Sequence, residues 1–149
     1  MTPIEKVYML EINVKLDKNL MREIYEKGFS RIPIYKNNRE NIVGCLHARD
    51  LILLNTEKKE LSLKQLSSIL FQEMVIVNAE EKLEPIFGYF KRGMTHIAVV
   101  TKTIISEFRD PEKKVIGIVT MEDIIEEIID DEIEDETRAH LENHENKVK

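Results

Sequence analysis

The 149-residue sequence has a single cysteine, no tryptophan and no long apolar run. One cysteine excludes an intramolecular disulfide framework, and Cys45, inside the segment IVGCLH, is expected to be a buried small side chain rather than a reactive thiol. No apolar segment approaches the ~18 residues that cross a bilayer, so no transmembrane helix is predicted, and no signal peptide is visible. With 42% hydrophobic and 34% charged residues, the composition is typical of a soluble globular domain, or of two small halves sharing a core.

Basic residues are scarce toward the C-terminus. The formal net charge is −6, yet residues 122–145 carry twelve acidic residues against one arginine. The rest of the chain is therefore mildly basic and could receive a small anion. No dense stripe of lysine and arginine accompanies exposed aromatic residues, so the pattern argues against binding to nucleic acid.

What the sequence does contain is one pattern that occurs twice. Residues 30–50 read SRIPIY, a polar gap and IVGCLHARD, while residues 95–124 read THIAVV, a longer polar gap and VIGIVTMEDI. Each copy follows a glycine that ends a helix, Gly28 or Gly93, and leads into a helix start that bears an aspartate. The repeat predicts two α/β (α+β) units with pseudo-twofold symmetry and a site at the seam between them.

Hydrophobic periodicity gives the expected elements. Helices are predicted at 17–27, 63–70 and 80–92, at the start of RDLILLN and from Met121 onward, and strands at 30–35, 42–47, 71–79, 95–101 and 114–120. The predicted division is a first unit at 1–55, a connector at 56–71, a second unit at 72–136 and a polar tail at 137–149. The segment 102–113 is expected to be a long loop, and its extra length suggests a contact site.

The segment GIVTMEDIIEEII carries the sharpest local pattern. Thr120 precedes apolar residues at helical spacing and Asp123 follows three positions later, which is a capping-box arrangement worth roughly 1 kcal/mol. The same hydroxyl and carboxylate at a helix N-terminus can also bind a sugar diol with a phosphate beside it. Spacing alone leaves both roles open. The first copy keeps an aspartate, Asp50, but has His47 in place of the threonine.

Other chemistry is less well supported. His140 and His144 have metal-ligand spacing, but they lie in a polar tail without partner ligands, so a solvated helix is the better interpretation. No activated nucleophile, acid–base pair or complete phosphate loop can be identified, so the sequence does not predict an enzyme.

The repeat, the phrase Gly-apolar-apolar-Thr-x-x-Asp and the SRIPIY strand together resemble the tandem cystathionine-β-synthase (CBS) domain pair, or Bateman module. More narrowly, MTPIEKVYMLEIN, GFSRIPIYKNNRENIVGCLHARDL and GIVTMEDIIEEIIDDEI resemble the cytosolic CBS pair of the CNNM/CorC family of magnesium-transport membrane proteins. The resemblance covers residues 1 to about 136. It implies a regulatory module at the cytosolic face of a membrane, attached to a transmembrane domain, with adenine nucleotide, typically Mg-ATP but also ADP or AMP, in the cleft between units.

The resemblance also implies which residues bind the nucleotide. Thr2 matches the family threonine that precedes a proline, Thr120 and Asp123 match the ribose and phosphate binders, and Glu122 lies where an acidic residue can face the Mg²⁺ of a Mg-triphosphate. Base and phosphates are matched by Phe29, where the family often has tyrosine, and by Ser30, Arg31, Ile32 and Pro33.

Arg31 has a physical reason to contact phosphate, since its guanidinium matches phosphate oxygens bidentately; a surface salt bridge is its alternative role. A second, pseudo-symmetric site would use His47, Asp50, Thr95 and His96. This second site is expected to be empty or weak, because His47 replaces the hydroxyl.

Two protein contacts are predicted as well. The resemblance implies that, in animal members, the loop at 102–114 receives a PRL-type phosphatase and that an Asp-Pro pair enters the phosphatase active site. Asp110 and Pro111 occupy this place in the present chain. Alternatively, this Asp-Pro pair is an ordinary turn. A homodimer is expected through the apolar stripe of the helix at 121–133 and through Leu51, Ile52 and Leu54. Alternatively, the stripe is filled from within the same chain.

Overall fold

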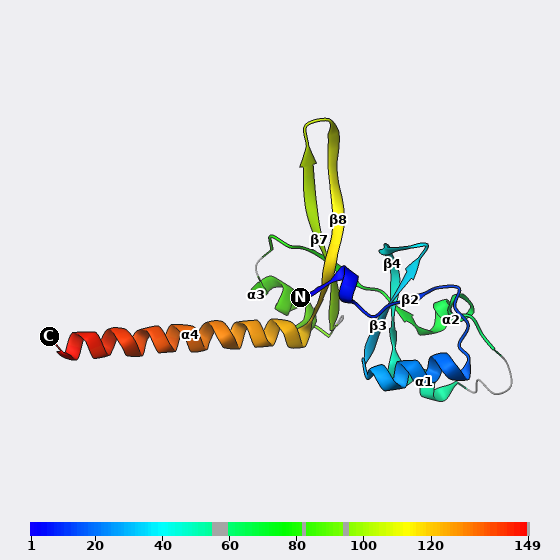
Figure 1. Ribbon diagram of the computed structural model, residues 1–149, viewed down its shortest axis with the longest axis horizontal. Coiled ribbons are helices and arrows are strands. Elements are labelled where there is room, and N and C mark those ends of the chain that lie inside the picture. The colour runs from blue at the N-terminus through cyan, green and yellow to red at the C-terminus, as the bar shows by residue number, and fades with distance from the viewer. Residues whose placement is uncertain (55–59, 82, 94–95, 149) are drawn as a thin grey trace.

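The computed structural model describes residues 1–54, 60–81, 83–93 and 96–148. Two four-stranded sheets stand side by side, each with helices packed on it, and this confirms the predicted pair of α/β units (Figure 1). Among the described residues, no helix is both long enough and apolar enough to span a bilayer.

The first unit has the strand order β2-β3-β4-β5 and the second has β1-β8-β7-β6. The first contains β2 (Leu10–Glu11), α1 (Lys18–Lys27), β3 (Arg31–Lys36), β4 (Asn38–His47), the 3-10 helix η2 (Ala48–Leu53), α2 (Leu63–Leu70) and β5 (Phe71–Gln72). The second contains β1 (Thr2–Pro3), the 3-10 helix η1 (Ile4–Lys6), β6 (Val75–Asn78), α3 (Leu83–Lys91), β7 (Ile97–Ser106), β8 (Arg109–Thr120) and α4 (Met121–Val148).

The two sheets follow the same plan. Each has a long antiparallel hairpin, β3-β4 or β7-β8, with a parallel strand on one side and a short antiparallel strand on the other. The short strand β1 comes from the N-terminus yet joins the second sheet, whereas β5 joins the first. The expected single strand at 71–79 is therefore two strands in different sheets. The domain boundaries stay a prediction, although α2 contributes Leu63 and Leu66 to the core of the first unit.

Helix ends follow the local sequence signals. Asp17 caps α1 by accepting a hydrogen bond from the amide of Leu20 at 2.7 Å, and Gly28 ends the helix with φ 73°. Gly93, with φ 75°, follows α3 in the same way. Both positions need the left-handed conformation that glycine adopts without steric cost.

Three apolar clusters hold the chain together. One lies under the helices of the first unit and includes Ile32, Ile34 and Leu46. A second lies under α3 and α4 and includes Phe90, Val100 and Ile124. The third joins the two sheets and contains Cys45, Ile97, Val99 and Ile118. This third cluster, called the seam core below, fixes which strand faces of the two units meet.

The prediction of a long loop at 102–113 is wrong, because most of these residues continue the strands β7 and β8. The strands pair as far as Ser106 and Arg109, so the hairpin turns at residues 107–108 and projects from the body as a twisted two-stranded arm (Figure 1). Its β-branched run Thr103 to Ile105 suits a strand. Within the arm, backbone groups that face the partner strand pair with it, and those that face outward are left to water. Asp110 and Pro111 lie in β8, close to the turn.

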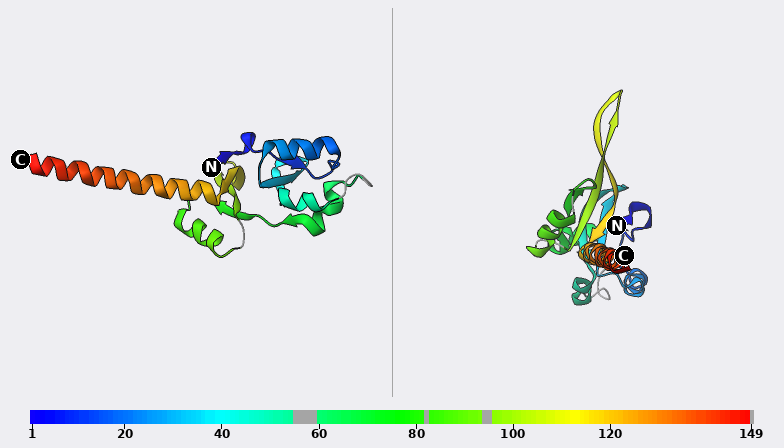
Figure 2. Two further views of the ribbon diagram at one scale, coloured as in Figure 1. Left: turned by 90° about the horizontal axis from the view of Figure 1, so that it is seen from below. Right: turned by 90° about the vertical axis from the view of Figure 1, so that its left-hand side faces the viewer.

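Two further boundaries differ from expectation. The helix expected at RDLILLN is the short 3-10 helix η2. The last helix begins at Met121 as predicted but runs without a break for 28 residues, through the predicted polar tail, and extends away from both sheets (Figure 2). Exposed acidic side chains on successive turns explain why its distal part has no core to pack against.

Candidate functional site

The capping-box interpretation of Thr120 and Asp123 is confirmed. Asp123 Oδ2 accepts from the amide of Thr120 at 3.1 Å, and the hydroxyl of Thr120 accepts from the amide of Asp123 at 3.2 Å. These reciprocal bonds hold both side chains at the first turn of α4, half-buried beside the end of β8. Asp123 Oδ1 makes no hydrogen bond within the described part of the chain. A sugar hydroxyl can therefore be added there without first breaking the cap.

Strand alternation shows which side chains face the seam. Residues two apart on a strand project from the same face, and residues paired across strands do so too. Ile118 and Ile97 are in the seam core, so Thr120, two positions after Ile118 and paired with Ile97, also projects toward the first unit. Thr2 pairs with Ile118 and shares its face.

The first unit presents two nitrogen-bearing side chains, His47 and Arg31, to the same seam. Cys45 belongs to the seam core, so His47, two residues along β4, projects toward the second unit. Arg31 is the strand partner of His47 and lies on the same face. The structure thus brings Thr2, Arg31 and Thr120, which are distant in the sequence, to one junction between the sheets.

The other predicted residues of the first unit are placed differently. Ile32 and Pro33 are fully buried, and Ile32 belongs to the core of the first unit, so only its backbone is available to a ligand. The carbonyl of Ser30 accepts from the amide of Ala48 at 2.8 Å. Phe29 stacks on Tyr8 with ring centroids 6.0 Å apart. Burial and a hydrogen bond to Glu23 raise the pKa of Tyr8 to about 12, so its phenol stays neutral.

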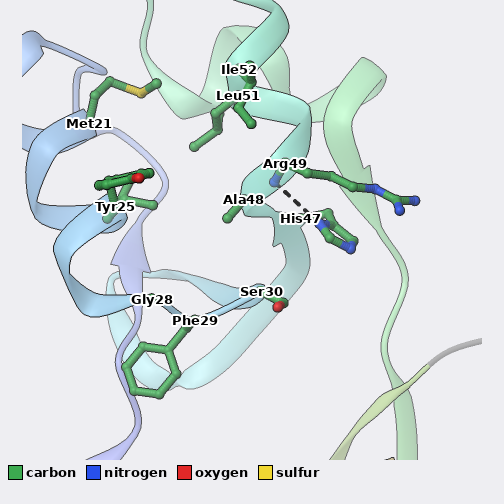
Figure 3. Close-up of a pocket in the computed structure, with 11 residues that line it drawn as sticks. Met21, Tyr25, Gly28, Phe29, Ser30, His47, Ala48, Arg49, Leu51 and Ile52 are labelled. Carbon is green, nitrogen blue, oxygen red and sulfur yellow. Dashed lines mark hydrogen bonds between the residues drawn. The ribbon is translucent and has the colours of Figure 1, made fainter.

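Next to the seam, a cavity of about 320 Å³ lies between α1 and η2 (Figure 3). Met21 and Tyr25 from α1 line one side, and Leu51 and Ile52 from η2 line the other. Ser30, His47 and Arg49 form a polar edge, and Phe29 stands at its mouth. An apolar floor with a few polar groups at one edge is the usual character of a small-molecule site.

His47 is the residue that connects cavity and seam. Its Nδ1 accepts from the amide of Arg49 at 3.4 Å (Figure 3). Burial lowers the pKa of His47, and the charges of Arg31 and Arg49 lower it further, with a smaller contribution from His96 and an opposing one from Asp50. The imidazole is therefore neutral at pH 7, in a region dominated by positive charge.

The proposed second set is only partly described. Asp50 lies in the first turn of η2, His96 immediately precedes β7, and Thr95 lies outside the described residues. The carbonyl of His96 accepts from the amide of Met121 at 3.0 Å, as the carbonyl of Ser30 does from Ala48. Because the two bonds are equivalent, His96 occupies in the second unit the position that Ser30 occupies in the first. Ser30 follows Gly28 by two residues and His96 follows Gly93 by three, so the second copy has one extra residue between the glycine and the strand.

Sequence reasoning missed Arg49. It lines the cavity, follows His47 directly and contributes to the positive potential there. Alignment of the two copies could have identified it. Residues 47–50 (HARD) correspond to residues 120–123 (TMED), so Arg49 stands where the second copy has Glu122. The two copies therefore carry opposite charges at equivalent helix starts.

Two predicted contact residues, Glu122 and Asp110, are exposed, and so is His140, which was expected to lie on a solvated helix. Glu122 lies in the first turn of α4, Asp110 near the tip of the arm and His140 on the distal part of α4, while the side chain of His144 is outside those described. No cluster of three potential metal-binding side chains occurs within the described ranges.

Comparison with known proteins agrees with this architecture. Residues 66–130 match the CBS domain family. Over 102 residues, the chain is 33% identical to a DUF21 domain-containing protein of Arabidopsis thaliana; the match covers 68% of this chain. The chain spans 23% of the length of that relative.

Solved structures extend the match to both units. The CBS domain of the bacterial CNNM/CorC family Mg²⁺ transporter in complex with ATP is 26% identical with a TM-score of 0.70, covering 87% of this chain and 83% of the other. A CBS-domain pair with bound AMP from Klebsiella pneumoniae is 27% identical with a TM-score of 0.64, covering 87% and 94%. The chain is thus a pair of CBS domains. Among such pairs, it resembles those of CNNM/CorC Mg²⁺ transporters and is a homologue of a DUF21 protein.

Proposed function

We propose that this CBS pair is a regulatory module that binds adenine nucleotide, typically Mg-ATP, at the seam between its units. The observation that carries the proposal is the convergence of Thr2, Arg31 and Thr120 on facing sides of the seam core. Similar CBS pairs with bound ATP and AMP support the choice of ligand.

Each group has a separate role. Asp123 accepts hydrogen bonds from the ribose hydroxyls, while the hydroxyls of Thr120 and Thr2 donate to the ligand. Arg31 binds phosphate oxygens through its guanidinium, and the N-terminus of α4 adds a favourable dipole. The base packs near Phe29 and the backbone of residues 30–33. The donor set fits a nucleotide phosphate, because hydroxyl, guanidinium and helix-end amides are all groups that bind phosphate oxygens.

Magnesium is held mainly through the phosphates of ATP. We assign Glu122, exposed beside Asp123 in the first turn of α4, as the carboxylate that faces it. Mg²⁺ offsets the repulsion between a triphosphate and this acidic helix start. No separate protein metal site is needed.

Nucleotide binding is regulatory because the site belongs to both units. A ligand that contacts β3 of one sheet and β8 of the other stabilises one relative arrangement of the two. Since α4 continues directly from β8, a change at the seam is carried to that helix and, in the parent protein, to a transmembrane domain that moves magnesium. The module itself is not catalytic in this proposal and lies at the cytosolic face of the membrane.

The direct test is a thermal-shift panel of ATP, ADP, AMP and S-adenosylmethionine, each with and without Mg²⁺. A ligand at 100 times its dissociation constant adds about 2.7 kcal/mol, which corresponds to a rise of about 5 to 10 °C in the melting temperature for a chain of this size. Adenine nucleotides should give this rise. If none of the nucleotides does so at millimolar concentration, the proposal is wrong.

The arm supports a second candidate function, docking of another protein. Ile104, Ile105 and Phe108 are 46%, 83% and 92% exposed toward its end, and a group of exposed apolar side chains marks a candidate protein contact. We propose that a PRL-type phosphatase is the partner and that Asp110 enters its active site. Surface plasmon resonance should detect binding of the phosphatase to the native chain, with at least tenfold weaker binding by Asp110→Ala and little change for Glu40→Ala on the other hairpin. Equal binding by all three chains would contradict this docking mode.

A further inference from the structure

His47 has a structural position that the repeat pattern did not reveal. The sequence assigned Arg31 to one cleft and His47 to the other, but the two are partners across β3 and β4 and project from the same face. Side chains paired in this way have Cβ atoms about 4.5 to 5.5 Å apart. A phosphate bound by Arg31 therefore comes within reach of the imidazole.

The ring of His47 is held in a defined orientation. Its Nδ1 accepts from the amide of Arg49 at 3.4 Å, which requires the neutral ring to carry its proton on Nε2 (Figure 3). Nε2–H is then a donor, and no acceptor for it occurs within the described part of the chain. The backbone contact thus leaves the outer edge of the ring ready to donate to an anion.

The surroundings of His47 are mostly cationic. Arg31 comes from β3, Arg49 and Asp50 from η2, and His96 from the segment that precedes β7. Asp50 is the one carboxylate among these neighbours. In this environment the protonated ring is disfavoured, and an incoming phosphate with up to two negative charges reverses the balance, since a nearby opposite charge favours the charged form. The proton is taken up at Nδ1, so the ring gives up the 3.4 Å contact from the Arg49 amide and keeps Nε2–H as its donor to the phosphate.

We infer that His47 is a phosphate-binding residue of the seam, acting beside Arg31, and that nucleotide binding at the seam is coupled to proton uptake by this imidazole. The inference rests on the proposed function, because it needs a nucleotide in the seam. It goes beyond that function by making affinity depend on pH between about 6 and 8. Thr120 stands at the equivalent position of the second unit and has no titrating group, so the two halves of the module respond differently to pH.

The sign follows from proton linkage. If the ligand raises the pKa of His47, the complex holds more protons than the free chain, and affinity rises as pH falls. A rise of one pKa unit corresponds to a tenfold limit in affinity. We therefore expect AMP to bind about three- to fivefold more tightly at pH 6 than at pH 8 for a rise of one pKa unit, after correction for the ionisation of AMP itself.

The test combines two measurements on the full chain with AMP as the probe. Proton NMR follows the ring resonances of His47, His96 and His140 across pH 5 to 8.5, with and without saturating AMP. Calorimetry measures AMP affinity at pH 6 and pH 8 for the native chain, His47→Thr, His47→Gln and His140→Gln. Because all four proteins bind the same ligand, comparing their pH slopes removes the titration of AMP.

The expected result is an upward shift in the pKa of His47 on AMP binding and a pH slope that is lost in both His47 variants. His140 lies on the distal, exposed part of α4, so its ring resonances should be the same with and without AMP, and His140→Gln should keep the native slope. Binding of AMP without any change at His47, or with equal slopes in all four proteins, overturns this inference and leaves the proposed function standing. Absence of AMP binding at both pH values overturns both.

Discussion

Gly117 lies in β8 with its Cα facing the carbonyl oxygen of Thr2 so closely that an added Cβ would overlap that oxygen. The short strand β1 can approach β8 only because this position has no side chain. Since Thr2 belongs to the predicted nucleotide site, a glycine in one unit controls the placement of a ligand-binding residue from the N-terminus.

Gly117→Ala should displace β1 and weaken nucleotide binding without unfolding the second unit. Overpacking of this kind costs roughly 1 to 3 kcal/mol, and we expect at least a fivefold loss of ATP affinity in calorimetry. Gly44→Ala is the matched control in the first unit, because its added Cβ would meet Cβ and Cδ2 of Phe71 at 3.2 Å, which needs a far smaller shift than the overlap at Gly117 and lies away from β1. Unchanged ATP affinity in Gly117→Ala would show that Thr2 does not contribute to the site.

Asp123→Ala should abolish tight nucleotide binding while the fold persists. A hydrogen bond to a charged group contributes about 1.5 to 3 kcal/mol, so loss of two ribose contacts reduces affinity more than a hundredfold. The helix loses only its cap, which is worth about 1 kcal/mol. Asp50→Ala, at the equivalent place in the first unit, is the control for calorimetry and circular dichroism. Retained affinity in the Asp123 variant would reject the site assignment.

ATP binding should require Mg²⁺, because the triphosphate approaches a helix start that carries Glu122, Asp123, Glu126 and Glu127. Two like charges ~4 Å apart repel by about 4 kcal/mol at an effective dielectric constant near 20. Calorimetry in EDTA and in millimolar Mg²⁺ should therefore give very different ATP affinities, whereas AMP, with less charge, should be nearly indifferent. An ATP affinity that does not change on removal of Mg²⁺ would refute this electrostatic argument.

A homodimer is expected through exposed apolar side chains on both units. Tyr25, Ile52 and Leu53 are 87%, 80% and 86% exposed in the first unit, and Ile129 and Ile133 on α4 are 48% and 56% exposed. Leu51, predicted to join this contact, is instead buried in the core, so it is not available for it. Leu54, also predicted to join it, is partly buried against the same core.

The monomer mass is 17.5 kDa. Sedimentation equilibrium at tens of micromolar should give about twice this mass, as expected for an isologous dimer. Ile52→Asp and Ile129→Asp should return the chain to monomer with native circular dichroism. Ile128→Asp is a poorer test, because Ile128 packs against the second core and its substitution destabilises the fold. A native chain that sediments as monomer, with and without Mg-ATP, would exclude the dimer.

Cys45 should be unreactive until the chain unfolds. Burial in the seam core raises its pKa from 9.0 to about 11, so the reactive thiolate is rare at pH 8. Ellman's reagent should modify it quickly in guanidinium but slowly in native buffer. Because the unfolded thiol ionises first, the free energy of unfolding should fall as the pH rises from 9 toward 11. Rapid modification of the native chain would show that the seam opens readily.

Local chemistry was readable from the sequence wherever one segment decides the outcome. Asp17, Gly28 and Gly93 set helix ends, and Thr120 with Asp123 forms the predicted cap, because capping and left-handed backbone depend on a few adjacent residues. The repeat likewise predicted the paired α/β units. The arm and η2 were missed because polar residues in a two-stranded ribbon resemble a loop, and because a short apolar run does not distinguish a 3-10 from an α-helix.

Only the tertiary structure decided which residues share the seam. The sequence matched Thr2, Arg31, Thr120 and Asp123 to a family site, but it separated Arg31 from His47 and gave no sign of Arg49. Strand register places Arg31 opposite His47, and packing of Cys45 against Ile97, Val99 and Ile118 turns those faces toward each other. Register and sheet packing are set by long-range contacts between residues far apart in the chain, and a one-residue shift reverses every side chain, so local patterns could not have fixed them.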